Sequence, residues 1–291
     1  MRIAHFSDIH VLDLTGVRPW AFANKRAVGG LNLLLSRARE YSQQVLARLV
    51  DDVNQQRPDH ILVSGDISNL SLRAEFVRAR EILDRLSLPP SEVTLVPGNH
   101  DCYTRSAKRR DDFSDVFAPY LRGDFVAGDR VEWPFLRIRG DLALVAINTA
   151  HPSLPLLAVG TVGERQRQAV ARLLADERVA DRFRLVMLHH PPHVANAHWH
   201  NRLTDSDKFV EMLSEAGAEL LIHGHLHRTL RHQIESRHGQ IPVVGVNSGS
   251  WLSPKDATRR ARYNIYQIEG RQLVRIEQRS YHPDADAFIA D

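Results

Sequence analysis

The sequence predicts an α/β protein with a parallel or mixed β-sheet covered by helices. Short apolar segments alternate with longer segments of helical periodicity in the amino-terminal third, and this alternation is typical of such a sheet. The segment 60–64 is a continuous apolar run, as expected of a strand covered on both faces. The hydrophobic share of 43% and the charged share of 25% over 291 residues are those of an ordinary soluble globular protein.

The first part of the chain predicts three strands and two helices. Strands are expected at 2–7, 60–64 and 93–96, and helices at about 42–56 and 72–86. Ser42 offers an N-cap for the first of these helices, and Pro58 stops it. The segment 11–41 has no strand pattern, so it is interpreted as an insert between the first strand and the first helix.

The rest of the chain predicts a long polar helix followed by several strands and two further helices. The helices are expected at 107–121, at 166–174, and from Asp205-Ser206 to Gly217 as the C-terminal stop. The strands are expected at 135–139, 142–147, 184–188, 220–222, 229–234, 243–246, 263–268 and 273–278. No linker or internal repeat divides the sequence, so one domain is expected.

Charge and cysteine content argue against several classes of protein. The formal net charge is +3, and the basic clusters at 108–110 and 259–260 are too short for a nucleic-acid-binding face. Nucleic acid is therefore not an expected partner, and a nuclease is a secondary alternative. Cys102 is the single cysteine, which excludes an intrachain disulfide and fits a reducing compartment. The sequence has no leader pattern and no apolar run near the ~20 residues that cross a bilayer, so a cytoplasmic location is expected.

Polar clusters follow five predicted strands at their carboxyl ends, where α/β folds usually hold their sites. The clusters are Asp8-Ile9-His10, Gly65-Asp66, Gly98-Asn99-His100-Asp101, His189-His190-Pro191-Pro192 and Gly224-His225-Leu226-His227. The candidate metal ligands among them are Asp8, His10, Asp66, Asn99, His189, His225 and His227. Nitrogen and oxygen donors in this number, without a thiolate, are too many for one tetrahedral ion but suit two ions that share a carboxylate.

Such a site predicts phosphoester hydrolysis. Two ions about 3.5–4 Å apart can bind a bridging water, lower its pKa so that it is hydroxide, and stabilise the attacking and leaving oxygens at phosphorus. The metals expected are Mn, Fe, Zn or Ni, because ligand softness alone does not choose among them. Mn is the favoured metal. His100 is expected to donate a proton to the leaving group, and Asp101 to fix the tautomer of His100 and keep it protonated.

The ordered series of motifs resembles the calcineurin-like metallophosphoesterase superfamily. The matching motifs are Asp8-x-His10, Gly65-Asp66-x-x-Asn69, Gly98-Asn99-His100-Asp101, His189 and Gly224-His225-x-His227. The resemblance implies a four-layer α-β-β-α sandwich of two mixed β-sheets flanked by helices. It also implies that one ion takes Asp8, His10, Asp66 and His227, and that the other takes Asp66, Asn99, His189 and His225. The role of His190 stays open between a hydrogen-bond donor behind the ligands and an exposed residue.

The domain organisation follows from this resemblance. Residues 1–283 are expected to form a single metallophosphoesterase domain with a cap-like insert at about 11–41, and residues 284–291 a frayed tail. Within the insert, apolar and basic residues resemble a short amphipathic surface: Trp20, Phe22, Leu31, Leu34 and Leu35 with Lys25, Arg26, Arg37 and Arg39. A cap packed on the domain explains these residues equally well.

The substrate is expected to be a nucleotide-type phosphodiester or pyrophosphate, since the motifs are similar to those of bacterial cyclic-nucleotide phosphodiesterase-like members. The alternative is pyrophosphate hydrolysis of UDP-2,3-diacylglucosamine in lipid A biosynthesis, with residues 17–41 in peripheral contact with the inner membrane face. A non-catalytic scaffold is least favoured, because every ligand of the family is present. His193, His198 and His200 would line the substrate rim, or belong to a solvated loop.

Overall fold

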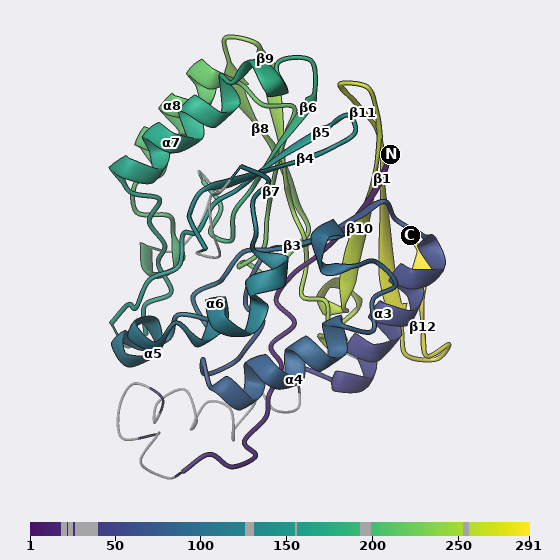
Figure 1. The fold of residues 1–291 in the computed structure, drawn as a ribbon. Coiled ribbons are helices and arrows are strands. Elements are labelled where there is room, and N and C mark those ends of the chain that lie inside the picture. Colours follow the sequence, from purple (N-terminus) through teal and green to yellow (C-terminus); the bar gives the residue numbers. More distant parts are fainter. Residues whose placement is uncertain are drawn as a thin grey trace.

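The protein consists of two mixed β-sheets with helices on their outer faces (Figure 1). The computed structural model describes residues 1–18, 22, 26, 40–125, 131–154, 156–192, 199–252 and 256–291. In this part of the chain each sheet has six strands, in the orders β12-β11-β10-β1-β2-β3 and β4-β5-β6-β7-β9-β8. The arrangement confirms the expected sandwich of two mixed sheets flanked by helices.

The first sheet joins a parallel half to an antiparallel half. The parallel strands are β1 (Arg2–Phe6), β2 (His60–Val63) and β3 (Val93–Leu95). The antiparallel strands are β10 (Arg262–Glu269), β11 (Gln272–His282) and β12 (Ala287–Ala290). Two helices, α3 (Gln43–Gln56) and α4 (Arg73–Leu83), follow β1 and β2 in the chain. As the sequence indicates, Ser42 caps α3, because its Oγ accepts a hydrogen bond from the Val45 amide at 3.3 Å.

The second sheet has a parallel centre with an antiparallel strand at each edge. The parallel strands are β5 (Leu142–Ala146), β6 (Phe183–Met187), β7 (Leu220–His223) and β9 (Gly239–Gly245). The edge strands are β4 (Phe135–Arg139) and β8 (Leu230–Ser236). Helices α7 (Glu164–Leu174) and α8 (Ser206–Ala216) lie side by side and cover this sheet (Figure 1).

Strand β5 is apolar at every position, and both of its faces are buried. Leu142 and Leu144 belong to the apolar cluster shared with the first sheet, whereas Ala143 and Val145 belong to the cluster under α7 and α8. Successive side chains of a strand point to opposite faces, so a strand buried on both faces needs an apolar residue at every position.

The predicted polar helix at 107–121 is wrong. The chain instead forms α5 (Arg105–Arg110), α6 (Asp112–Phe117) and the short 3-10 helix η4 (Ala118–Tyr120). Asp111 breaks the run because it adopts a left-handed conformation (φ 51°). The break accompanies the packing of Phe113 and Phe117 against Phe76 of α4, with ring centroids 5.8 and 6.1 Å away.

The expected frayed tail at 284–291 is also wrong. Strand β12 pairs with β11, and Phe288 is 4% exposed and packs against the ring of Tyr281 at 5.5 Å. Asp286 accepts a hydrogen bond from Arg48 of α3 at 2.6 Å. A short apolar run that pairs at the edge of the first sheet is enough to order this end of the chain.

Among the described residues, the remaining short helices are single 3-10 turns. They are η3 (Pro90–Glu92), η5 (Glu177–Val179), η6 (Trp199–Asn201) and η7 (Ala257–Arg259). Among the helices in the described ranges, none has the length and apolar character to cross a membrane. Of the proposed amphipathic residues in the insert, only Phe22 and Arg26 fall within those ranges; the others, from Trp20 to Arg39, lie outside the described residues. Arg26 is 3% exposed, so it is not part of a basic surface.

Candidate metal centre

The loops after β1, β2, β3, β6 and β7 meet at one place between the two sheets. They bring together the seven side chains that the sequence singles out: Asp8, His10, Asp66, Asn99, His189, His225 and His227. Four of these side chains come from the first sheet and three from the second. The site therefore lies where the carboxyl ends of both sets of parallel strands converge.

The side chains form two groups with Asp66 between them. Asp8, His10, Asp66 and His227 have possible ligand atoms within 4.8 Å of one another, and so do His189, His190 and His225. Oδ2 of Asp66 lies 3.9 Å from Nε2 of His10 and 3.4 Å from Nε2 of His189. The other oxygen, Oδ1, is fixed because it accepts a hydrogen bond from the His100 amide at 2.8 Å. Asp66 therefore reaches both groups with one oxygen.

The first group directs several lone pairs at one point. Nε2 of His10 is 3.2 Å from Nε2 of His227, which is itself 3.2 Å from Oδ1 of Asp8. Burial lowers the pKa of His10 well below its usual value, and its Nδ1 is buried without a hydrogen-bond partner in the described structure. Buried nitrogen and oxygen donors that face each other in this way fit a divalent cation.

In the second group, His189 lies close to two carboxylates. Burial opposes a charge on His189, but the carboxylates of Asp66 and Asp8 outweigh it and raise the pKa of His189 to about 9. Nδ1 of His189 donates to the carbonyl oxygen of Ser64 at 2.7 Å, which aims Nε2 at Asp66 and at Oδ1 of Asn99, 3.3 Å away. A divalent cation in this place would face the same two carboxylates and would need Nε2 of His189 without a proton.

His190 is not exposed, which removes one of the two interpretations of this residue. It is 0% exposed, and its Nδ1 lies 2.7 Å from Oγ1 of Thr149. Its Nε2 is buried without a hydrogen-bond partner in the described part of the protein, and its ring lies 4.4 Å from that of His225. Thr149 thus orients His190 so that its second nitrogen is available to the group of His189 and His225.

The backbone of the site is strained. Five of the candidate ligands have left-handed φ values, namely Asp8 (53°), His10 (43°), Asp66 (51°), His225 (73°) and His227 (49°). Such a conformation costs about 1–3 kcal/mol in a residue other than glycine and occurs mostly at functional sites. Hydrogen bonds to neighbouring loops hold it: the His10 amide donates to the Asp66 carbonyl at 3.0 Å, and Ser248 Oγ donates to the Asp8 carbonyl at 2.6 Å.

The glycines in the motifs allow the loops to approach closely. A Cβ on Gly98 would lie 2.2 Å from Oδ1 of Asp66, and a Cβ on Gly65 would lie 2.5 Å from Nδ1 of His189. A Cβ on Gly224 would lie 2.6 Å from Oδ2 of Asp8. Each glycine therefore leaves room for a side chain of the site.

The expected contact between Asp101 and the His100 imidazole is not the one that the structure contains. The Asp101 carboxylate accepts hydrogen bonds from the amides of Ile67, Ser68 and Gly98 at 2.8–3.1 Å. Nδ1 of His100 instead lies 2.6 Å from the carbonyl oxygen of Asn69. Asp101 therefore shapes the loop, and a backbone carbonyl fixes the His100 tautomer, with the proton on Nδ1.

Sequence reasoning missed three residues that support the site. Nδ2 of Asn69 donates to the His10 carbonyl at 2.5 Å, so Asn69 links His10 to His100. Its place in the Gly-Asp-x-x-Asn motif was the available signal. The hydroxyl of Tyr41 lies 3.3 Å from Nδ1 of His227, and Trp251 packs edge-on against His227 at 5.4 Å. No local pattern marks either aromatic residue.

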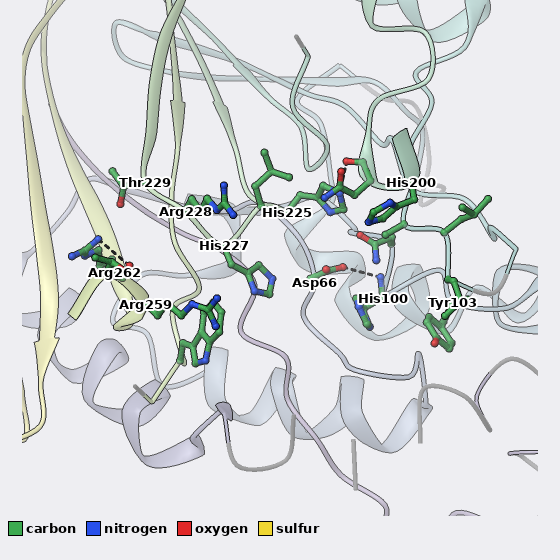
Figure 2. A pocket seen from close by; sticks show the side chains of 18 of the residues that line it. Asp66, His100, Tyr103, His200, His225, His227, Arg228, Thr229, Arg259 and Arg262 are labelled. Carbon is green, nitrogen blue, oxygen red and sulfur yellow. Dashed lines mark hydrogen bonds between the residues drawn. The ribbon is translucent and has the colours of Figure 1, made fainter. Parts of the chain in front are cut away.

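The site opens into a pocket of about 900 Å³ that runs to both sides of the metal centre (Figure 2). Figure 2 places Tyr103 and His200 at one end and Arg228, Thr229, Arg259 and Arg262 at the other. The lining also includes Leu156, Leu157, Ala158, Trp251, Asp256 and Thr258. Asp66, His225 and His227 lie between the two ends. His200 is thus on the rim, as one of the two interpretations predicts, while His193 and His198 lie outside the described residues.

Solved structures share this fold. A dimetal phosphatase from Danio rerio superposes with a TM-score of 0.61 at 15% identity, over 97% of this chain and 99% of that one. A purple acid phosphatase from yellow lupin (Lupinus luteus) seeds superposes with a TM-score of 0.62 at 10% identity, over 100% of this chain and 52% of that one. At these identities the similarity shows a shared fold.

The particular family follows from the sequence. The profile of the calcineurin-like phosphoesterases matches residues 1–229, so the chain belongs to that family, as its motifs indicate. A glycerophosphodiester phosphodiesterase, GpdQ, from Enterobacter lignolyticus (strain SCF1) is 33% identical over 101 residues. That match covers 35% of this chain and 30% of the relative.

Proposed function

We propose that the protein hydrolyses phosphodiester or pyrophosphate bonds of a nucleotide-type substrate in the cytoplasm, with two bound divalent ions. The observation that carries the proposal is the position of Asp66, whose Oδ2 lies within 3.4–3.9 Å of a nitrogen in each of the two ligand groups. The similarity to a glycerophosphodiester phosphodiesterase supports a diester as substrate.

The proposed ligand sets follow the two groups. One ion would be held by Asp8, His10, Asp66 and His227, and the other by Asp66, Asn99, His189 and His225. His190 is positioned to join the second set. When bound, the ions would supply Lewis acidity at phosphorus and would ionise a water molecule near neutral pH. Manganese is the favoured metal, with iron, zinc and nickel as alternatives.

His100 is the proposed proton donor to the leaving oxygen. Because Nδ1 already donates to the Asn69 carbonyl, Nε2 is the nitrogen that serves the substrate. The His100 ring is stacked on that of Tyr103, 5.5 Å away at 17°, which holds its plane in the pocket. Asp101 contributes by ordering the loop that carries Asn99 and His100.

Metal analysis combined with a diester assay tests the proposal. The purified protein should contain close to two equivalents of transition metal and should hydrolyse bis(para-nitrophenyl) phosphate. A chelator should abolish the activity, and readdition of manganese should restore it. A screen of cyclic nucleotides, dinucleotides and nucleotide-sugar lipids then identifies the substrate. A fully metallated protein that cleaves none of these would contradict the proposal and favour a scaffold.

The lipid-linked alternative, hydrolysis of UDP-2,3-diacylglucosamine with peripheral membrane contact, depends on the insert. Described residues of the insert contact the site. Arg26 donates to the carbonyl oxygens of Leu70 and Ser71 at 2.7 Å each, beside Asn69. The hydroxyl of Tyr41 lies 3.3 Å from Nδ1 of His227. The insert therefore adjoins the loop that holds His100. This supports a substrate-facing insert without distinguishing an acyl chain from a nucleotide.

A further inference from the structure

Three arginines line the pocket on the side away from His100. Arg228, Arg259 and Arg262 lie together beyond His227 in Figure 2, whereas His100 and Tyr103 lie on the other side of Asp66. Arg228 directly follows His227 in the chain, and Arg262 opens strand β10. We call these three residues the arginine end of the pocket.

Positive charge exceeds negative charge at the arginine end. Asp256 is the single carboxylate among the described lining residues there, and it lies 3.6 Å from Nε of Arg259. The Asp256 carboxylate also accepts hydrogen bonds from the amide and hydroxyl of Thr258 at 2.9 and 2.6 Å. Arg228 is exposed, and no ion pair of its guanidinium occurs in the described part of the chain. Outside the pocket lining, Oδ2 of Asp291 lies 4.0 Å from Nε of Arg262. Two carboxylates therefore lie near three guanidinium groups.

Uncharged groups also help to hold two of the arginines in place. The guanidinium of Arg259 lies over the ring of Trp251, 5.4 Å from its centroid, and Trp251 packs against His227. Nε of Arg262 donates to Oγ of Ser280 at 3.0 Å. Contacts of this kind position a guanidinium without adding a negative charge, so the arginine end keeps an excess of positive charge.

The arrangement gives the substrate a direction. The leaving oxygen must lie near His100 to receive its proton, so the departing group extends toward Tyr103. The group that stays on phosphorus then extends past His227 toward the arginine end (Figure 2).

We propose that Arg228, Arg259 and Arg262 form an anion subsite for a second phosphate or carboxylate, carried by the part of the substrate that stays on phosphorus. The preferred substrates are thus phosphoesters with an additional anionic group, not diesters with two neutral arms. The proposal rests on the proposed function, because it concerns the same pocket.

A matched pair of substrates tests the subsite. The para-nitrophenyl ester of thymidine 5′-phosphate is compared with the same ester carrying a further phosphate on the 3′-oxygen. In the wild-type enzyme the added phosphate should raise kcat/KM by about 10-fold to 100-fold, through KM. In Arg228→Gln/Arg259→Gln this preference should fall to about 3-fold or less. An ester with a carboxylate in place of the added phosphate shows which anion fits better.

The control variant is Arg165→Gln. Arg165 is an exposed arginine on α7 outside the pocket lining. Its replacement removes one positive charge, as each single replacement in the pocket does, but should leave the preference for the ester with the added phosphate at the wild-type value. The single variants Arg228→Gln and Arg259→Gln replace the double variant if it unfolds, and each should lose part of the preference. A preference that is absent in the wild type, or unchanged in the variants, overturns the subsite.

Binding separates failure of the subsite from failure of the proposed function. Titration calorimetry should give a lower Kd for thymidine 3′,5′-bisphosphate than for thymidine 5′-phosphate, and the difference should shrink in the double variant. This readout needs no turnover. If the metal-loaded wild type hydrolysed neither ester, the proposed function would be contradicted. Equal Kd values for the two nucleotides would contradict the subsite.

Discussion

At the scale of single residues, Asp66 is the side chain on which both ligand groups depend. In Asp66→Asn an amide replaces a carboxylate of the same shape, so one ligand atom becomes a hydrogen-bond donor that repels a cation. We expect this variant to lose most bound metal and to lose at least about 100-fold in turnover. Elemental analysis and diester hydrolysis measure the two effects.

The matched control is Asn99→Ala, which removes a neutral ligand from the second group alone. It should retain more metal than Asp66→Asn. If purified Asp66→Asn kept both ions and normal turnover, the two-ion model would be wrong.

His100 makes a second prediction at this scale. If His100 is the proton donor, His100→Ala should lose about 10²–10⁴-fold in turnover on a diester with a poor leaving group. The loss should be much smaller on a nitrophenolate, which departs without a proton, and metal content should hardly change. Equal losses on both substrates would make His100 a residue that positions the phosphate instead.

The residues of the site could be predicted from sequence only where a motif reports them. All seven candidate ligands converge, because each follows a strand directly and the strand ends meet. The partner of His100 could not be predicted: Asp101 is its neighbour in sequence, but its carboxylate faces the amides of other loops. Tyr41 reaches His227 from 186 residues away in the chain, which no local pattern encodes.

At the scale of elements, the tight loop after β3 depends on Gly98. In Gly98→Ala the new Cβ would lie 2.2 Å from Oδ1 of Asp66, so the carboxylate must move away from both groups. We expect loss of metal and activity with little change in far-ultraviolet circular dichroism. Gly140→Ala is the control, because a Cβ there meets nothing within 4 Å. With φ at 53°, it should cost about 1 kcal/mol of stability and keep its metal. Equal metal content in the two variants would contradict the close packing.

Elements with a clear period were predictable, and elements set by tertiary contacts were not. Strand β4 begins and ends at the expected residues because the turn at Gly140 separates two apolar runs. The break at Asp111 depends on the packing of Phe113 and Phe117 against Phe76, which is a tertiary contact. Asp205 is a second example of a local structure set by tertiary contacts. It is the N-cap residue of α8, but its carboxylate accepts hydrogen bonds from the amides of Val162 and Gly163, before α7.

At the scale of the whole molecule, the insert decides between a soluble and a lipid-linked substrate. If the insert binds acyl chains, Trp20→Glu/Leu34→Glu should abolish liposome binding and hydrolysis of an acylated nucleotide, because the buried charges oppose transfer into lipid. Turnover of a small soluble diester should persist. A variant that unfolds, or that loses both activities together, would make the insert a structural cap and favour the small-nucleotide substrate.

The metal centre also joins the two sheets, which gives the last prediction. Asp8, His10, Asp66 and Asn99 follow strands of the first sheet, and His189, His225 and His227 follow strands of the second. Without metal, contacts such as the hydrogen bond from the His225 amide to Asp8 Oδ2, at 3.0 Å, still cross the site, so the chelated protein should stay folded.

Ions that bind the folded chain more tightly than the unfolded chain stabilise it by about 2.7 kcal/mol at a free concentration 100 times Kd. Chelation should therefore lower Tm by roughly 5 °C or more, as scanning calorimetry can measure. In Asp66→Asn, which we expect to bind little metal, the same chelator should change Tm by much less. An unchanged Tm after verified removal of the metal would show that the ions contribute nothing to holding the two sheets together.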